Sequence, residues 1–109
     1  MLEALWTVEF GSYEAFGAGV VVFETGRIFG GDNQYYYIGN YDVKNDTVEG
    51  EVEVTHYSGP GYSVFGRLQK FHLKLSGKLQ EPIMELQGFL IESPDKKIWV
   101  RCTKRAELP

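Results

Sequence analysis

Apolar and polar residues alternate along most of the chain. In residues 2–10, Leu2, Trp6 and Phe10 fall on one face, and two glutamates fall on the other. Residues 47–57 repeat this pattern more clearly, with valines on one face and glutamates on the other. A period of two is typical of a strand that buries one face. No segment repeats its apolar residues with a helical period over three turns, so the sequence predicts strands throughout.

Turn-forming residues separate these runs. Thr25-Gly26, Gly31-Asp32-Asn33 and Lys44-Asn45-Asp46 each lie between two predicted strands. Evenly spaced strands joined by short turns indicate an antiparallel meander, and closure into a barrel removes its two edges. We therefore predict an all-β fold, an eight-stranded antiparallel up-and-down barrel that forms one domain over residues 1–109. The expected strands span residues 2–10, 16–24, 27–30, 35–43, 47–57, 69–78, 83–92 and 98–104, with a loop or short helical turn at 62–67 and a turn at 93–96.

The charges are unevenly distributed along the chain. Residues 1–59 hold ten Asp/Glu against two Lys/Arg, whereas residues 60–109 hold five against nine. Pairing of acidic with basic strands would explain this asymmetry and would help to fix the strand register. On the outer face we expect Glu49, Glu51 and Glu53 to lie opposite Lys70, His72 and Lys74.

Composition excludes several classes of function. The single cysteine rules out an internal disulfide and a multi-cysteine zinc site, and the net charge of −4 disfavours binding to nucleic acid. No apolar run approaches the length of a membrane helix, and residues 1–10 lack the basic start of a signal peptide. We expect a cytoplasmic protein with no cofactor, no metal and no contact with a membrane.

The residues that could carry chemistry have structural explanations. Gly17-Ala18-Gly19 leads into a strand, whereas a phosphate-binding loop leads into a helix. Asp32 has no second carboxylate or histidine within two residues, so a turn with an Asx-type hydrogen bond is favoured over a metal site. His56 lies on the apolar face of its strand, and Cys102 alternates inward as a small hydrophobe. We therefore expect a protein without enzymatic activity.

Two interpretations of the barrel interior remain open. Large side chains such as Trp6, Phe10, Phe23, Phe71, Leu73 and Leu86 could fill it. Alternatively, the glycines at positions 17, 19, 39, 50, 77 and 88 could leave room for one small apolar ligand. The tyrosines could likewise pair across strands or line such a cavity. The candidate cavity residues are Trp6, Tyr35, Tyr37, Tyr41, His56 and Phe71.

The sequence resembles a known family, most clearly around the predicted turn at residues 31–33. The run Gly26-Arg27-Ile28-Phe29-Gly30-Gly31-Asp32, preceded by Gly17-x-Gly19 and followed by Tyr37-x-Gly39-x-Tyr41, resembles the GrlR family, the negative regulators of type III secretion. The resemblance extends over nearly the whole chain in order and length. It implies a lipocalin-like eight-stranded barrel, a homodimer and a regulatory role through contact with a transcriptional activator.

The family's acidic docking loop is not matched here. Where the type member has four acidic residues, this chain reads Val43-Lys44-Asn45-Asp46, which has no net charge. We therefore expect this turn not to act as a docking site. Trp99 and Arg101, which project outward from the last strand, are the candidate partner or dimer interface because both residue types are common at binding hot spots. The leading function is regulation by protein contact, and binding of a small apolar ligand is the alternative.

Overall fold

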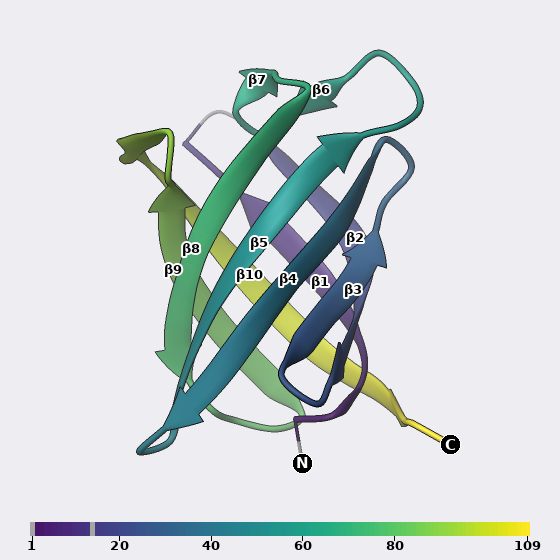
Figure 1. Cartoon of the computed structure of the whole chain (residues 1–109), viewed down its shortest axis with the longest axis vertical. Helices are drawn as coiled ribbons and strands as arrows, with labels where there is room; N and C mark the ends of the chain where they lie inside the picture. Colours follow the sequence, from purple (N-terminus) through teal and green to yellow (C-terminus); the bar gives the residue numbers. More distant parts are fainter. Residues whose placement is uncertain (1, 14) are drawn as a thin grey trace.

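Eight long strands close into a single barrel (Figure 1). The structure is a computed structural model that describes residues 2–13 and 15–109, so Met1 of the N-terminal segment considered above lies outside the described residues. Around the barrel the strands follow the order β1-β10-β9-β8-β5-β4-β3-β2, and every neighbouring pair is antiparallel. The predicted all-β, eight-stranded antiparallel barrel is thus confirmed. The barrel strands are β1 (Ala4–Gly11), β2 (Phe16–Glu24), β3 (Arg27–Gly31), β4 (Tyr35–Lys44), β5 (Thr47–His56), β8 (Lys70–Lys78), β9 (Ile83–Leu90) and β10 (Ser93–Glu107).

Two segments differ from their predictions. Residues 62–67 form a small hairpin of β6 (Tyr62–Ser63) and β7 (Gly66–Arg67), not a loop or a helical turn. The Ser63 hydroxyl accepts a hydrogen bond from the Phe65 amide and donates one to the Gly66 carbonyl, which closes this hairpin. Residues 93–96 belong to β10, which begins at Ser93 and is irregular between Ser93 and Lys97. This irregularity accommodates residues 94–96, so the turn itself shortens to residues 91–92.

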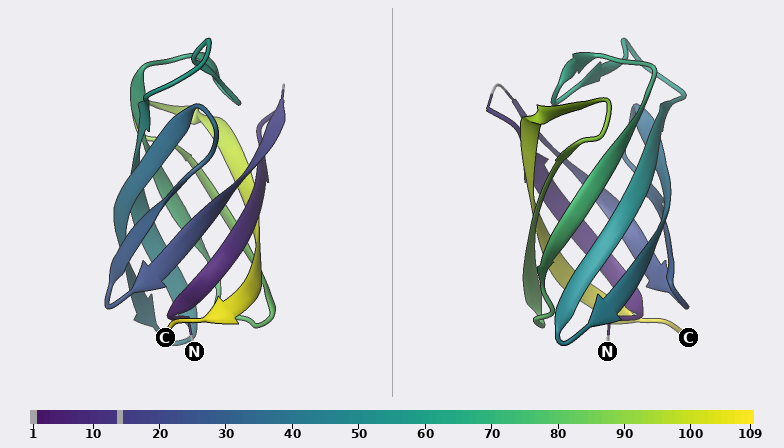
Figure 2. Two further views of the ribbon diagram at one scale, coloured as in Figure 1. Left: turned by 90° about the vertical axis from the view of Figure 1, so that its right-hand side faces the viewer. Right: turned by 60° about the vertical axis from the view of Figure 1, so that its left-hand side comes forward.

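The two ends of the barrel are built differently. One end carries both chain termini and the β2–β3, β4–β5 and β8–β9 turns, and the β6–β7 hairpin projects over the other end (Figure 2). At the first end, Thr25 adopts a φ of 50°, which is unusual for a β-branched residue. The Glu3 carboxylate holds it there by accepting hydrogen bonds from the Thr25 amide at 2.6 Å and from its hydroxyl at 3.3 Å.

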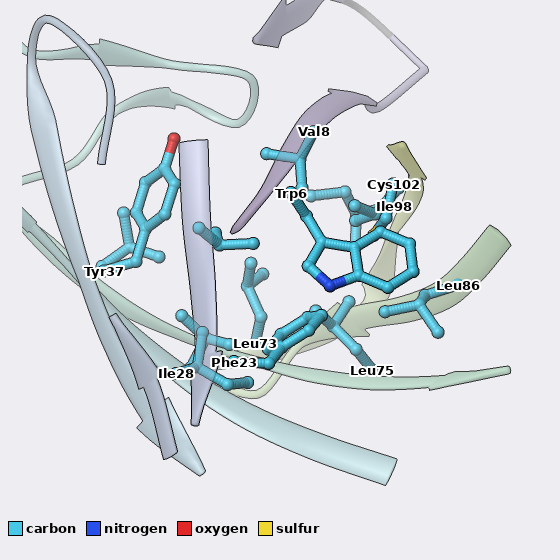
Figure 3. Close-up of a cluster of buried hydrophobic side chains, with 14 of the residues drawn as sticks. Trp6, Val8, Phe23, Ile28, Tyr37, Leu73, Leu75, Leu86, Ile98 and Cys102 are labelled. Carbon is cyan, nitrogen blue, oxygen red and sulfur yellow. The ribbon is translucent and has the colours of Figure 1, made fainter. Parts of the chain in front are cut away.

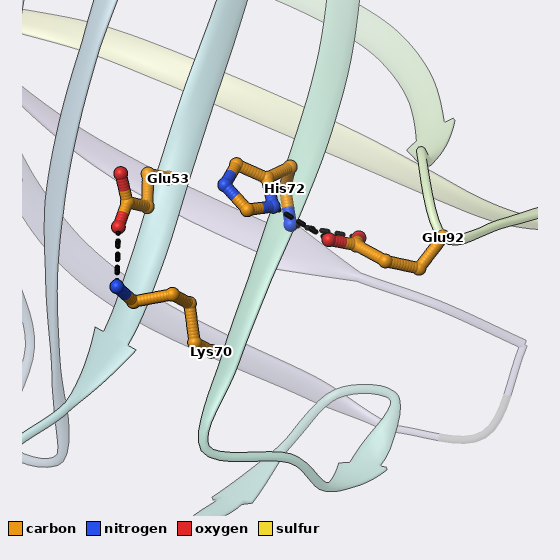
Figure 4. A network of polar contacts seen from close by, with 4 residues as sticks. All are labelled: Glu53, Lys70, His72 and Glu92. Carbon is orange, nitrogen blue, oxygen red and sulfur yellow. Dashed lines mark hydrogen bonds and ion pairs between the residues drawn. The ribbon is translucent and has the colours of Figure 1, made fainter.

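Ion pairs on the outer face join β5, β8 and the β9–β10 turn (Figure 4). Glu51 lies directly opposite Lys74, with 3.6 Å between the carboxylate and the ammonium group, as the sequence predicts. Glu53 lies opposite His72 but pairs diagonally with Lys70 at 2.9 Å, which leaves His72 to contact Glu92 at 2.5 Å. Glu49 lies opposite Ser76, so two of the three expected glutamates form ion pairs with lysines of β8.

Inward side chains from strands around the barrel form one buried cluster (Figure 3). Trp6 has no exposed surface, and its indole N–H donates a hydrogen bond of 2.9 Å to the Leu2 carbonyl. The Trp6 and Phe23 rings lie 5.9 Å apart, and Phe23 contacts Tyr41 at 5.4 Å. These aromatic contacts seal one end of the interior. Within the described residues, no helix is long and apolar enough to cross a membrane.

Candidate ligand-binding site

The rest of the interior is hollow. A cavity of about 420 Å³ lies inside the barrel, within the range typical of small-molecule sites. Apolar side chains form most of its wall. They come from strands all around the barrel, and they include Val8, Val21, Val54, Phe71, Leu73 and Val100. The question that the sequence left open is therefore answered in favour of a hollow interior.

The predicted cavity residues divide into two groups. Tyr35, Tyr37, Tyr41 and Phe71 line the cavity. Trp6 does not, although Phe23, the ring against which it packs, does. For Trp6 the expectation of a cavity position is wrong.

His56 also lies outside the cavity wall. Its Nε2 lies 2.9 Å from the Gly59 carbonyl oxygen, and its ring packs against Tyr35 with 5.6 Å between centroids. The histidine thus belongs to the rim, where it contacts the loop that follows β5. Among the glycines that could open the interior, those at positions 17 and 50 line the cavity, whereas those at 19, 39, 77 and 88 do not.

Polar groups gather at the mouth of the cavity, around the β3–β4 turn. The Oδ1 atom of Asp32 accepts hydrogen bonds of 2.8 Å from the backbone amides of Gln34 and Tyr35, the Asx-type arrangement that the sequence predicts. Its Oδ2 atom accepts a hydrogen bond of 2.5 Å from the Tyr37 hydroxyl. The sequence signal for this contact is an inward tyrosine shortly after the turn, and alternation alone does not pair it with Asp32.

Burial and the neighbouring carboxylate both act on the Tyr37 phenol. Burial raises the pKa of Tyr37 well above its ordinary value, and the hydrogen bond to Asp32 raises it further, because both favour the protonated phenol. Gly19 makes room for this side chain: a Cβ atom at Gly19 would lie 2.7 Å from the Tyr37 hydroxyl oxygen and 2.8 Å from the Gly31 carbonyl oxygen. A glycine at this position therefore allows Tyr37 to reach Asp32.

The segment that contains β6 and β7 covers part of the mouth. Val64 within it is buried, and Phe65 packs against Phe71 with 5.8 Å between ring centroids. The Gln34 side-chain oxygen accepts hydrogen bonds from the amides of Gly61 and Tyr62, which fastens this segment to the β3–β4 turn.

Two hydroxyl groups add to this attachment. The Tyr35 hydroxyl lies 2.6 Å from the Gly61 carbonyl oxygen and 2.7 Å from that of Leu68, so it donates to one of them at a time. From the β1–β2 loop, the Ser12 hydroxyl donates a hydrogen bond of 2.5 Å to the Val64 carbonyl. We call residues 57–69 the cap, because several separate hydrogen bonds hold this segment over the mouth.

Reactive chemistry is sparse in the described part of the chain. Cys102 lines the cavity, and burial raises the pKa of its thiol to about 12, so the thiol stays protonated and unreactive at neutral pH. Residues 2–13 and 15–109 contain no group of three or more side chains that could hold a metal ion.

The candidate interface residues lie on the outer wall. Trp99 is 46% exposed and lies directly opposite Gly11, where an added Cβ atom would come within 2.6 Å of the indole ring. The ring thus covers the backbone of β1 and leaves its other side accessible. Arg101 lies between Glu9 of β1 and Glu85 of β9 in the strand register, so oppositely charged residues flank it.

Sequence comparisons add no assignment to this geometry. No protein-family model matches the chain, and no curated protein is significantly similar to it in sequence.

Proposed function

We propose that the protein binds one small, predominantly apolar molecule inside its barrel. The observation that carries this proposal is the cavity of about 420 Å³ with its apolar wall and one polar end. Transfer of an apolar ligand from water into such a wall is favourable by roughly 25 cal/mol for each Å² of apolar surface removed from water. The proposed function requires no chemical step and suits a carrier or a sensor.

Native mass spectrometry of the protein purified from cells tests this proposal directly. We expect one small molecule to be bound per chain and to be released on denaturation. A filled variant provides the second arm. Val54→Phe adds volume to the cavity wall between Tyr37 and Phe71, the residues that lie opposite Val54 on the neighbouring strands. This variant should lose the ligand.

Val20→Phe is the matched control, because it adds the same volume to an outward and exposed position of β2. It should retain the ligand. Absence of any bound molecule in the wild-type protein, together with failure to bind any added apolar probe, would contradict the proposal.

Protein contact, with a role like that of the GrlR regulators, is the second candidate function. A specific feature of the outer wall favours it: Leu5, Val22, Phe29 and Ile38 lie directly opposite one another in consecutive strands from β1 to β4. Phe29 and Ile38 are exposed by 38% and 47%. An uncharged row that crosses four strands is a suitable surface for a second copy of this chain, and the family resemblance also implies a homodimer.

Light scattering on the wild-type protein and three variants tests the dimer. Phe29→Lys should convert a dimer to a monomer if the apolar row is the interface, whereas Trp99→Ala should do so if β10 is. Lys74→Ala, on the outer face of β8, serves as the control and should leave the dimer intact. A monomeric wild-type protein would contradict the dimer on either face.

A further inference from the structure

The mouth of the cavity carries charge of one sign. Among the described residues that line the cavity, Asp32 is the only one with a formal charge. Arg27, which is the cation nearest to Asp32 in the sequence, and Arg67 of the cap contact the rings of Phe29 and Tyr62 and do not line the cavity. A ligand head group at this end therefore meets a carboxylate and no compensating cation.

The Asp32 carboxylate is held in place but is not saturated. It accepts three hydrogen bonds, from the amides of Gln34 and Tyr35 and from the Tyr37 hydroxyl. An ionised carboxylate has about four acceptor positions, so one position remains for a donor from a ligand. The side chain is half-buried beneath the cap, where water screens its charge less than it would on the open surface.

The apolar part of the cavity limits the rest of the ligand. Its volume of about 420 Å³ corresponds to roughly fourteen groups the size of a water molecule, each about 30 Å³. An alkyl chain of about a dozen carbon atoms, or a compact ring system of similar size, matches this space.

From these features, and on the basis of the proposed function, we infer that the ligand is a cationic amphiphile: an apolar body of about a dozen carbons with a protonated amine that donates to the Asp32 carboxylate. A fatty acid of the same length is selected against, because its carboxylate would lie near Asp32 without a cationic partner. Like charges in a poorly solvated site disfavour binding, whereas a charge-assisted hydrogen bond favours it.

Isothermal titration calorimetry with three probes of equal chain length tests this inference. The probes are dodecylammonium, dodecanol and dodecanoate at physiological salt, with the two ions below their micellar concentrations and dodecanol below its solubility limit. We expect one dodecylammonium to bind per chain, at least about tenfold more tightly than dodecanoate, with dodecanol between them. Equal or tighter binding of dodecanoate would overturn the inference but leave the proposed function standing. Failure of all three probes to bind would overturn the inference, and together with an empty purified protein in native mass spectrometry it would overturn the proposed function as well.

Two variants separate the effect of the Asp32 carboxylate at the mouth from the effect of the protein's overall negative charge. Asp32→Asn keeps an oxygen that can accept hydrogen bonds from the backbone amides of Gln34 and Tyr35, but it removes the charge. The preference for dodecylammonium over dodecanol should therefore disappear. Asp42→Asn makes the same change in net charge at an exposed position near the other end of the barrel and should keep the preference. An unchanged preference in Asp32→Asn would overturn the inference. If Asp32→Asn does not fold, the comparison of the three probes on the wild-type protein decides the matter alone.

Discussion

The Tyr37 hydroxyl donates a hydrogen bond of 2.5 Å to the Asp32 carboxylate, which joins the inner face of β4 to the turn that precedes it. A hydrogen bond to an ionised acceptor is shorter and about twice as strong as one between neutral groups. Because Asp32 also caps the turn through two backbone amides, this contact positions the one charged group among the described residues of the cavity wall. Turn geometry and cavity chemistry therefore depend on the same side chain.

Stability should fall at high pH because Tyr37 is buried and hydrogen-bonded to Asp32. The pKa of Tyr37 is raised above its ordinary value of 10 by burial and then by Asp32, so the folded state holds the phenolic proton more tightly than the unfolded state does. The resulting stabilisation is fully present below pH 10 and is lost as the pH rises above it, by up to about 1.4 kcal/mol per pH unit. Urea unfolding between pH 9 and pH 11.5 should show this decline.

Tyr37→Phe separates this effect from other titrations. The variant should be less stable at neutral pH by about 1–2 kcal/mol, because Asp32 loses a hydrogen bond. Above pH 10 its stability should decline less steeply than that of the wild-type protein. Part of the slope should persist, since burial also raises the pKa of Tyr35. Parallel curves for the two proteins would contradict the role assigned to Tyr37.

The two tryptophans should respond very differently to the same substitution. Trp6 is completely buried and bonded to the Leu2 carbonyl, so Trp6→Phe leaves both a void and an unpaired acceptor. We expect a loss of about 2–4 kcal/mol in the free energy of unfolding. Trp99→Phe changes a half-exposed ring on the outer wall and should stay within about 0.5 kcal/mol of the wild-type value.

Urea unfolding monitored by circular dichroism measures both effects. Fluorescence is less suitable, because each variant retains a different tryptophan and its signal would report on a different region of the barrel. A Trp6→Phe variant as stable as Trp99→Phe would show that the closed end is not packed as described.

These tryptophans also show which features of the fold the sequence predicts and which it does not. Alternation assigns Trp6 inward and Trp99 outward, and both assignments agree with their burial. Alternation does not give the level at which an inward side chain lies along the barrel axis. That level depends on strand tilt and stagger, which follow from the closed barrel as a whole. For this reason alternation predicts both Trp6 and Tyr37 in the cavity, although only Tyr37 lines it.

The cap was not predictable for a related reason. Residues 57–69 show no extended alternation, and their conformation depends on contacts with distant parts of the chain. Gln34 lies 27 residues from Gly61 in the sequence, and Ser12 lies 52 residues from Val64, yet both fasten the cap. Local sequence patterns carry no information about such pairs.

The cap should open more readily when its attachment is weakened. Tyr35→Phe removes the hydroxyl that donates to the Gly61 and Leu68 carbonyls but keeps the ring against Phe71. We expect a loss of about 1 kcal/mol in stability and faster amide hydrogen exchange over residues 59–68. Hydrogen exchange measured by mass spectrometry checks this. Tyr36→Phe, on the outer face of the same strand, is the control and should leave exchange in the cap unchanged.

Cys102 should resist thiol reagents for as long as the barrel stays closed. The side chain is 1% exposed, and burial raises the pKa of its thiol from 9.0 to about 12. At pH 8 a thiol with that pKa is ionised in roughly one molecule in ten thousand, and the thiolate is the form that reacts. Modification by a disulfide reagent in native buffer should therefore be slow, and in concentrated urea it should be complete within the mixing time.

Because Cys102 lines the cavity, the rate of its modification in native buffer also reports on access through the mouth, so Tyr35→Phe should raise this rate. Equal rates in native buffer and in urea would show that the interior is open to reagents, which would contradict both the closed wall and the fastened cap.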